Sequence, residues 1–180
     1  MAKTQGKYFP DVAAGNVFIA STTAAGVAIP ISTGTAATVG LWNTSTTKNA
    51  VPIYATFGVT SGTIALGVFG LAQQYCGFNI ATGAPCSAIT LVAPKNAMLN
   101  SGKSTAMSSF SATATVTGGS AALWFGKSIE SATVGLGIFD GRFDFDGSLI
   151  VPPGTMVFLC SSVAQTAIMS CSFCWAEVDI

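Results

Sequence analysis

The 180-residue chain contains no histidine and only seven carboxylates. Without histidine, seryl and cysteinyl nucleophiles lack their usual general base, and metals lack their commonest nitrogen ligand. Three of the acids, Glu130, Glu177 and Asp179, form no local pair suited to acid–base work. A carboxylate-only glycosidase would need a sugar-binding cleft, for which three tryptophans and three tyrosines are few. We therefore expect no enzymatic activity, no cofactor and no small-molecule substrate.

Charge of either sign is scarce as well. Only 8% of the residues are charged and the net charge is zero, whereas about 25% are charged in an average soluble domain. A monomer of 18.2 kDa exposes roughly 8,000 Å², which leaves about one charge per 600 Å². Such a surface favours burial against neighbours, so we expect an obligate oligomer or a member of a larger shell.

The few charges are divided unevenly along the chain. Residues 1–126 hold five lysines and Asp11, whereas residues 127–180 hold Lys127 and Arg142 against six acids, giving +4 and −4. Two explanations stay open: chance clustering in loops, or patches of opposite sign that set the register between subunits. No basic stripe is present, so direct binding of DNA or RNA is not expected.

Long apolar runs are also absent. The 46 residues 49–94 carry no charge, but prolines, glycines and hydroxyl residues interrupt them throughout. Their apolar pieces are far shorter than the roughly 20 residues of a spanning helix. The first 15 residues contain no apolar stretch typical of a secretory leader. We expect no membrane partner, and synthesis in the cytoplasm before the chain joins a particle.

Apolar residues alternate with a period of two along most of the chain, which indicates strands. Turn sequences such as Asp-Gly and Pro-Pro-Gly separate the alternating segments. Many short strands at this spacing predict a single all-β, antiparallel sandwich or barrel over residues 17–180. The predicted strands are 17–21, 27–32, 37–43, 51–60, 62–70, 87–93, 104–117, 121–126, 132–139, 142–151, 155–163 and 166–178.

Residues 1–16 show little periodicity and predict an N-terminal arm that packs on a neighbour or stays mobile. Within it Lys3, Lys7, Tyr8 and Phe9 are our candidates for contacting a partner. Two other segments break the alternation. Residues 72–85 are predicted as a loop or a single turn, and 94–103 as a connection with room for a short helix.

The chain ends in MSCSFCWAEVDI, which contains a Cys-x-x-Cys pair. In a strand, Cys171 and Cys174 point to opposite faces about 10 Å apart. That geometry excludes a disulfide between them and a shared zinc ion, so we interpret both as packing residues. Cys160 lies in an apolar strand and is predicted to be a buried thiol. Cys76 and Cys86 bracket a short excursion, and whether they pair stays open.

Two further motifs suggest ions or phosphate. Asp140, Asp144 and Asp146 lie close together in DGRFDFDG, but the spacing does not match a calcium loop. The alternative is a strand whose charged residues face water while Phe143 and Phe145 face the core. SGKS at 101–104 lacks the upstream glycine of a P-loop and predicts a turn with a solvated lysine.

Two segments resemble small virion structural proteins of tailed bacteriophages. FDGSLIVPPGTMVFLCSS contains the pattern G-x-L-x-V-P-P-G, and the chain closes on a W-x-E strand. The segment 37–67 is similar through Leu41, Trp42 and Asn43 and a closing Ser-Gly-Thr, although Thr44 stands where proline is common. The similarity covers 37–67 and 143–180, about 40% of the chain.

The resemblance implies a β-sandwich, often a jelly roll, that assembles as a homotrimer inside a virion. The first expectation is a head decoration (cement) protein that binds across major capsid subunits after assembly in the host cytoplasm. The second is a tail- or fibre-associated protein that binds a host surface. The third is a jelly-roll shell protein. The resemblance transfers no catalytic residue.

Overall fold

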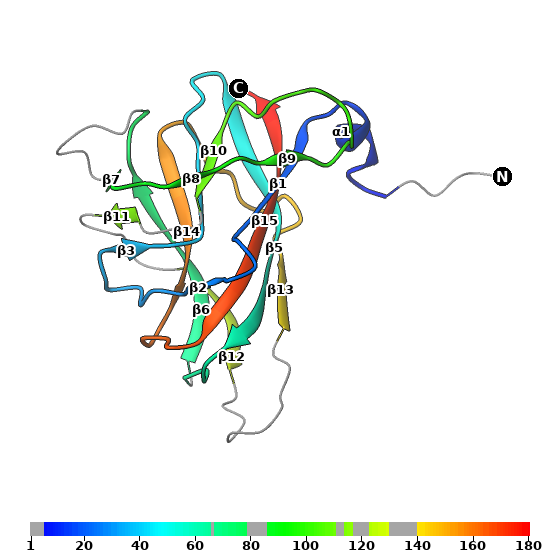
Figure 1. Cartoon of the computed structure of the whole chain (residues 1–180). Helices are drawn as coiled ribbons and strands as arrows, with labels where there is room; N and C mark the ends of the chain where they lie inside the picture. Colours follow the sequence, from blue (N-terminus) through cyan, green and yellow to red (C-terminus); the bar gives the residue numbers. More distant parts are fainter. Residues whose placement is uncertain (1–5, 66, 79–85, 111–113, 117–122, 130–139) are drawn as a thin grey trace.

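The computed structural model of the chain describes residues 6–65, 67–78, 86–110, 114–116, 123–129 and 140–180. These residues form mostly strands, arranged in antiparallel sheets that pack against each other (Figure 1). The predicted all-β, antiparallel sandwich is therefore confirmed.

Sheet A is built around the last strand of the chain. Its strand order is β13-β5-β15-β1-β9, and the short strand β2 also pairs with β15. The pairing of β5 with β15 runs from Lys48 opposite Asp179 to Ser61 opposite Ile168. The strands of sheet A are β1 (Val17–Ser21), β2 (Val27–Ala28), β5 (Lys48–Ser61), β9 (Lys95–Asn96), β13 (Asp140–Asp144) and β15 (Ile168–Asp179).

Sheet B lies opposite sheet A, and a small sheet C lies beyond sheet B. The order in sheet B is β12-β6-β14-β4-β10-β8, and in sheet C it is β3-β11-β7. The strands of sheet B are β4 (Gly40–Trp42), β6 (Gly67–Tyr75), β8 (Leu91–Val92), β10 (Ser108–Phe110), β12 (Leu123–Ile129) and β14 (Thr155–Ser161). The strands of sheet C are β3 (Ala36–Ala37), β7 (Cys86–Ser87) and β11 (Ala114–Val116).

Eight of these strands define a jelly roll. In chain order they are β1, β4, β5, β6, β12, β13, β14 and β15. Sheet A places the first, eighth, third and sixth of them side by side, and sheet B the second, seventh, fourth and fifth. All of these pairs are antiparallel. This is the order of a two-sheet jelly roll made of two Greek keys.

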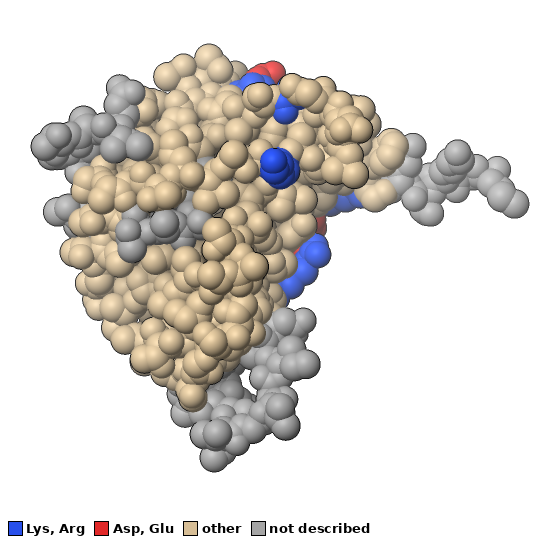
Figure 2. Space-filling model, viewed as in Figure 1, with Lys and Arg blue, Asp and Glu red and all other residues tan. Residues whose placement is uncertain are grey.

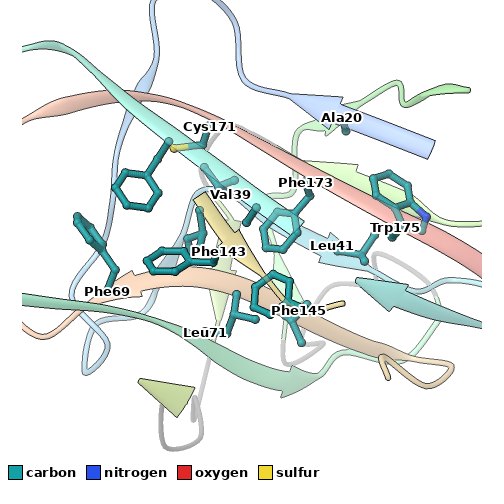
Figure 3. Packing of buried hydrophobic residues seen from close by; sticks show 14 of the residues in the cluster. Ala20, Val39, Leu41, Phe69, Leu71, Phe143, Phe145, Cys171, Phe173 and Trp175 are labelled. Atoms are coloured by element: carbon teal, nitrogen blue, oxygen red, sulfur yellow. The ribbon is translucent and has the colours of Figure 1, made fainter. Parts of the chain in front are cut away.

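The main core fills the space between sheets A and B. In β15 the large residues Met169, Cys171, Phe173 and Trp175 point inward and are almost fully buried. Figure 3 shows Phe173 and, from β6, Leu71 pointing into this space. The alternation of one bulky and one small face of the last strand is thus confirmed, and it fixes the register of sheet A.

Each sheet is also covered on part of its outer face. Sheet C covers an apolar cluster on sheet B that includes Trp42, Met156 and Phe158. The helix α1 (Phe9–Ala13) lies over a smaller cluster on sheet A that includes Val17 and Cys174. The molecule therefore has four layers, in the order α1, sheet A, sheet B and sheet C, with an apolar cluster at each of the three interfaces between them.

Several predicted boundaries were wrong. The strand predicted at 62–70 begins at Gly67 and continues to Tyr75, because its polar end pairs with β14 up to Thr155. The strand predicted at 142–151 ends at Asp144, and a turn follows in which Asp146 and Gly147 have φ of 51° and 81°. The segment 94–103 contains the short strand β9 and turns rather than a helix. The strand predicted at 132–139 lies outside the described residues.

Candidate interaction surface

The charged residues of the molecule are segregated by sheet. Among the described residues, all of them except Lys127 lie in sheet A, in or beside α1, or in the segments that follow β9 and β13. Lys127 lies in β12 of sheet B. In Figure 2 the visible charges of the described residues gather toward the α1 end, and the other described residues in this view are uncharged. We call sheet A with α1 and these segments the charged side, and the described residues of sheets B and C and their loops, which carry only Lys127, the uncharged side.

The uncharged side exposes large apolar side chains. Five of them are between two fifths and three fifths exposed: Tyr75, Phe78, Leu91, Leu123 and Trp124. Leu123 also lines a small hollow of about 40 Å³, whose other wall includes Ile150 from the segment that follows β13. Exposed apolar side chains with few charges around them make this side the candidate interaction surface.

Two of the exposed aromatic rings rest on glycines. A Cβ atom added at Gly70 of β6 would lie 2.9 Å from the ring of Trp124 and 2.6 Å from the carbonyl oxygen of Leu123. A Cβ atom added at Gly154 would lie 2.6 Å from the ring of Tyr75, and Gly154 has φ of 75°. The predicted Pro-Pro-Gly turn therefore has the positive φ that its glycine allows. Because Gly154 has no side chain, the Tyr75 ring can lie directly against this turn.

The charged side contains a larger hollow, of about 540 Å³, on the outer face of sheet A. Its floor is apolar and is formed by residues of β1, β5 and β15, among them Val17, Ile53 and Cys174. Two tyrosines and three charged residues also line it: Tyr8, Tyr54, Arg142, Asp144 and Asp146.

The charges at this hollow are paired with each other. Arg142 donates from Nε to Asp144 Oδ1 at 2.7 Å, and its guanidinium lies 4.0 Å from the ring centre of Tyr54. Lys7 Nζ lies 2.8 Å from Asp146 Oδ2, and the Tyr8 hydroxyl donates to Asp146 Oδ1 at 2.8 Å. The hydrogen bonds from Lys7 and Tyr8 lower the pKa of Asp146 below its ordinary value.

The predicted partner-binding residues of the arm fall into three groups. Lys7 and Tyr8 contact Asp146 of their own chain, so the described part of the arm packs on its own sandwich. Phe9 begins α1 and is about half exposed. Lys3 lies outside the described residues. That these four side chains bind a neighbour stays a prediction.

The acidic motif DGRFDFDG forms the strand that we proposed as the alternative to a calcium loop as far as Asp144, and Asp146 lies in the turn that follows. Phe143 and Phe145 are buried in the core, whereas Arg142, Asp144 and Asp146 are exposed. Within the described residues, no group of three or more acids and cysteines is arranged to hold a metal ion.

The three unpaired cysteines of the described chain are packing residues. Cys171 belongs to the main core, and Cys174 to the cluster beneath α1, on the opposite face of β15. Burial raises the pKa of Cys171 to about 12 and that of Cys174 to about 11. Burial likewise raises the pKa of Cys160, in β14, to about 11. All three thiols are therefore protonated and unreactive near neutral pH.

Cys76 and Cys86, whose pairing the sequence left open, form a disulfide with Cα atoms 5.2 Å apart. Cys76 directly follows β6 of sheet B, and Cys86 begins β7 of sheet C. Both belong to the apolar cluster between the two sheets. The disulfide therefore ties sheet C covalently to the face that it covers.

Sequence reasoning missed three residues that organise this architecture. Glu177 is buried, and its carboxylate accepts hydrogen bonds from the Thr105 hydroxyl and the Ala106 amide. Asn43 is fully buried and donates to the carbonyl oxygens of Lys48 and Val151. Lys103, predicted to be solvated, donates to the Ala14 carbonyl at 3.3 Å and to the Asn16 side chain. Only the W-x-E and L-x-N patterns pointed to Glu177 and Asn43.

The described residues thus form a jelly-roll sandwich whose charged residues lie mainly on one side. Comparison with protein-family models, with curated proteins and with solved structures found no match to this chain. Within the described residues, no helix has the length and apolar character needed to cross a membrane.

Proposed function

We propose that the protein is a non-enzymatic structural component of a virion and that it assembles through its uncharged side. The most specific form of the proposal is a capsid decoration protein that associates with copies of itself, as a homotrimer, and binds across major capsid subunits. The observation that carries it is the segregation of charge: among the described residues, the exposed apolar side chains of sheet B lie on a side where Lys127 is the one charged residue.

Assembly explains this surface better than exposure to water does. A standard protein interface buries about 800 Å² on each partner, and the surface of this chain totals 9191 Å². Contacts with two or three neighbours would therefore cover a large share of the uncharged side. Repeated over a lattice, weak contacts of this kind add up through avidity and resist internal pressure on the shell.

A second form of the proposal is a jelly-roll shell protein. The strand order of the two sheets supports it, because jelly rolls of this order occur in viral capsid domains. The same fold also occurs in lectins and other proteins, so topology alone does not choose between these functions. The tail- or fibre-associated form is kept as the third alternative.

Light scattering coupled to size-exclusion chromatography tests the proposal first. We expect a monodisperse trimer, or a larger closed assembly, at micromolar concentration. A compact monomer at every concentration would contradict assembly through the uncharged side. For location, antibody labelling of particles is expected to mark the head surface; labelling of the tail would favour the fibre-associated alternative, and a protein forming the continuous shell would favour the jelly-roll shell.

A further inference from the structure

We propose that the hollow on the charged side binds a neutral saccharide, with a pyranose ring over its apolar floor and hydroxyls at its ionic rim. This inference does not depend on the proposed function. It concerns the opposite side of the sandwich, so a ligand there and a neighbour on the uncharged side can be bound together.

The size and lining of the hollow are those of a small-molecule site. Its volume of about 540 Å³ lies within the roughly 300–1,000 Å³ of ligand pockets, which are mainly apolar with a few polar groups that fix orientation. Here Val17, Ile53 and Cys174 supply a buried floor, and Ile19 and Ala97 are partly exposed beside it. This floor offers contacts to the C–H face of a sugar ring.

The rim offers a donor and an acceptor next to each other. Arg142 uses Nε for Asp144, and its terminal N–H groups have no acceptor among the described residues. The second carboxylate oxygen of Asp144 likewise has no donor among the described residues. A guanidinium N–H donates to one hydroxyl oxygen while a carboxylate oxygen accepts from the neighbouring hydroxyl. Two adjacent hydroxyls of a sugar match this pair.

The charge balance selects a neutral ligand. Each carboxylate of the rim already has a cation at 2.7 or 2.8 Å: Arg142 for Asp144 and Lys7 for Asp146. An anionic ligand would meet both carboxylates, and a cationic one would compete with Lys7 and Arg142. A neutral, hydroxyl-rich ligand leaves both ion pairs intact and satisfies their remaining hydrogen-bonding groups.

Two of the three tyrosines in the chain lie at this hollow. The sequence alone made the aromatic content seem too low for a sugar cleft, because nothing in it indicated that Tyr8 and Tyr54 would lie on one sheet face. The guanidinium of Arg142 lies over the Tyr54 ring. The stack presents a flat, polar plane at the edge of the apolar floor.

Saturation-transfer NMR on the full chain tests the proposal. The probes are the methyl glycosides of glucose, galactose, N-acetylglucosamine and rhamnose, each at millimolar concentration. Benzoate and benzyltrimethylammonium serve as charged probes of similar size. We expect transfer to the ring C–H protons of at least one glycoside and weaker or no transfer to the charged probes.

Two variants locate the binding. Ala97→Phe fills the hollow from its wall and is expected to abolish transfer to the glycoside. Asp144→Asn removes the charged acceptor and is expected to weaken binding about tenfold or more. The matched control is Asp179→Asn, which breaks another exposed ion pair of sheet A, with Lys48, and is expected to leave binding unchanged. Thermal melting confirms that each variant is folded.

The proposal is overturned if none of the four glycosides receives saturation, or if only a charged probe does. It is also overturned if transfer to the glycoside persists in folded Ala97→Phe, because the sugar would then bind elsewhere.

Discussion

The two sides of the sandwich are covered in different ways. Sheet B carries sheet C, joined to it by the Cys76–Cys86 disulfide and by side chains that are almost fully buried. Among the described residues, sheet A is covered by the five-residue helix α1, held by apolar contacts of Val12, exposed hydrogen bonds and the ion pair of Lys7 with Asp146, and a hollow of about 540 Å³ lies beside it. The uncharged side thus has a disulfide-linked covering layer, whereas the charged side carries the ion pairs and the hollow and also exposes apolar side chains such as Leu99 and Ile180. Under the two proposals made above, assembly and ligand binding would use opposite faces of the same jelly roll.

The largest expected effect comes from placing a charge on the uncharged side. Trp124→Lys puts an ammonium into the proposed interface without a partner, which costs at least about 3 kcal/mol. We expect self-association to weaken more than about a hundredfold, measured by light scattering over a concentration series.

The matched control for this variant is Val178→Lys, on the charged side. Val178 and Trp124 are both 46% exposed, so the two lysines differ mainly in the side on which they lie. Val178→Lys is expected to leave association unchanged. If the two variants weaken association equally, the division into two functional sides is wrong.

Reduction of the disulfide is expected to have the next largest effect and to act on the uncharged side. The bond closes a loop with a sequence separation of 10, and the loss of such a constraint costs about 3 kcal/mol. Dithiothreitol should therefore lower the melting temperature and increase amide exchange in β7 and β11. The variant Cys76→Ala/Cys86→Ala should be insensitive to dithiothreitol, and a wild type that is equally insensitive would contradict this role.

Substitutions at two glycines of sheet A compare how tightly its inner and outer faces are packed. A Cβ atom added at Gly141 would lie 2.2 Å from the ring of Phe57, which packs in the main core, whereas one added at Gly58 meets nothing within 4 Å. We expect Gly141→Ala to lower the free energy of unfolding by about 1–3 kcal/mol through overpacking. Gly58→Ala should cost far less, as measured by urea denaturation. Equal losses would mean that the outer face of sheet A is as tightly packed as the inner one.

Lowering the pH is expected to have the smallest effect on stability, through the ion pair of Asp146 on the charged side. The folded-state pKa of Asp146 is lowered by its hydrogen bonds with Lys7 and Tyr8. The contribution of Asp146 to the free energy of unfolding is therefore fully present above the ordinary aspartate pKa of about 4. It is lost as the pH falls through the lowered pKa of the folded state.

Trypsin cleavage after Lys7 reports on the same contact near neutral pH. Asp146→Asn removes the ion pair, and we expect cleavage to rise by on the order of a few-fold, as is usual for exposed pairs. The control Asp144→Asn, which breaks the neighbouring pair with Arg142, should leave cleavage unchanged. Equal cleavage in both variants would show that Asp146 does not hold the N-terminal segment.

The sequence predicted the fold class well because a strand's period of two is a local property. The strand at 17–21 was predicted with its exact bounds, and the alternation of β15 assigned Cys171 and Cys174 to opposite faces. The polar end of β6 was missed because Gln73 and Gln74 are strand residues only through their pairing with β14.

The sequence predicted that the surface carries few charges, but not where in the fold those charges lie. Scarce charge indicated a surface that neighbours cover, but the sequence divided the charges into two halves of the chain, whereas the fold divides them between sheets. The hollow was not predictable, because Tyr8, Tyr54 and Arg142 come from three distant segments that only the order of sheet A brings together.

Amide hydrogen exchange on the assembled and the diluted protein tests the central claim most directly. The account predicts that assembly protects peptides of the uncharged side, above all those covering 69–75 and 123–126. Peptides covering 142–146 and the N-terminal segment should exchange equally in both states. Protection confined to the charged side, or a protein that stays monomeric throughout, would contradict the account.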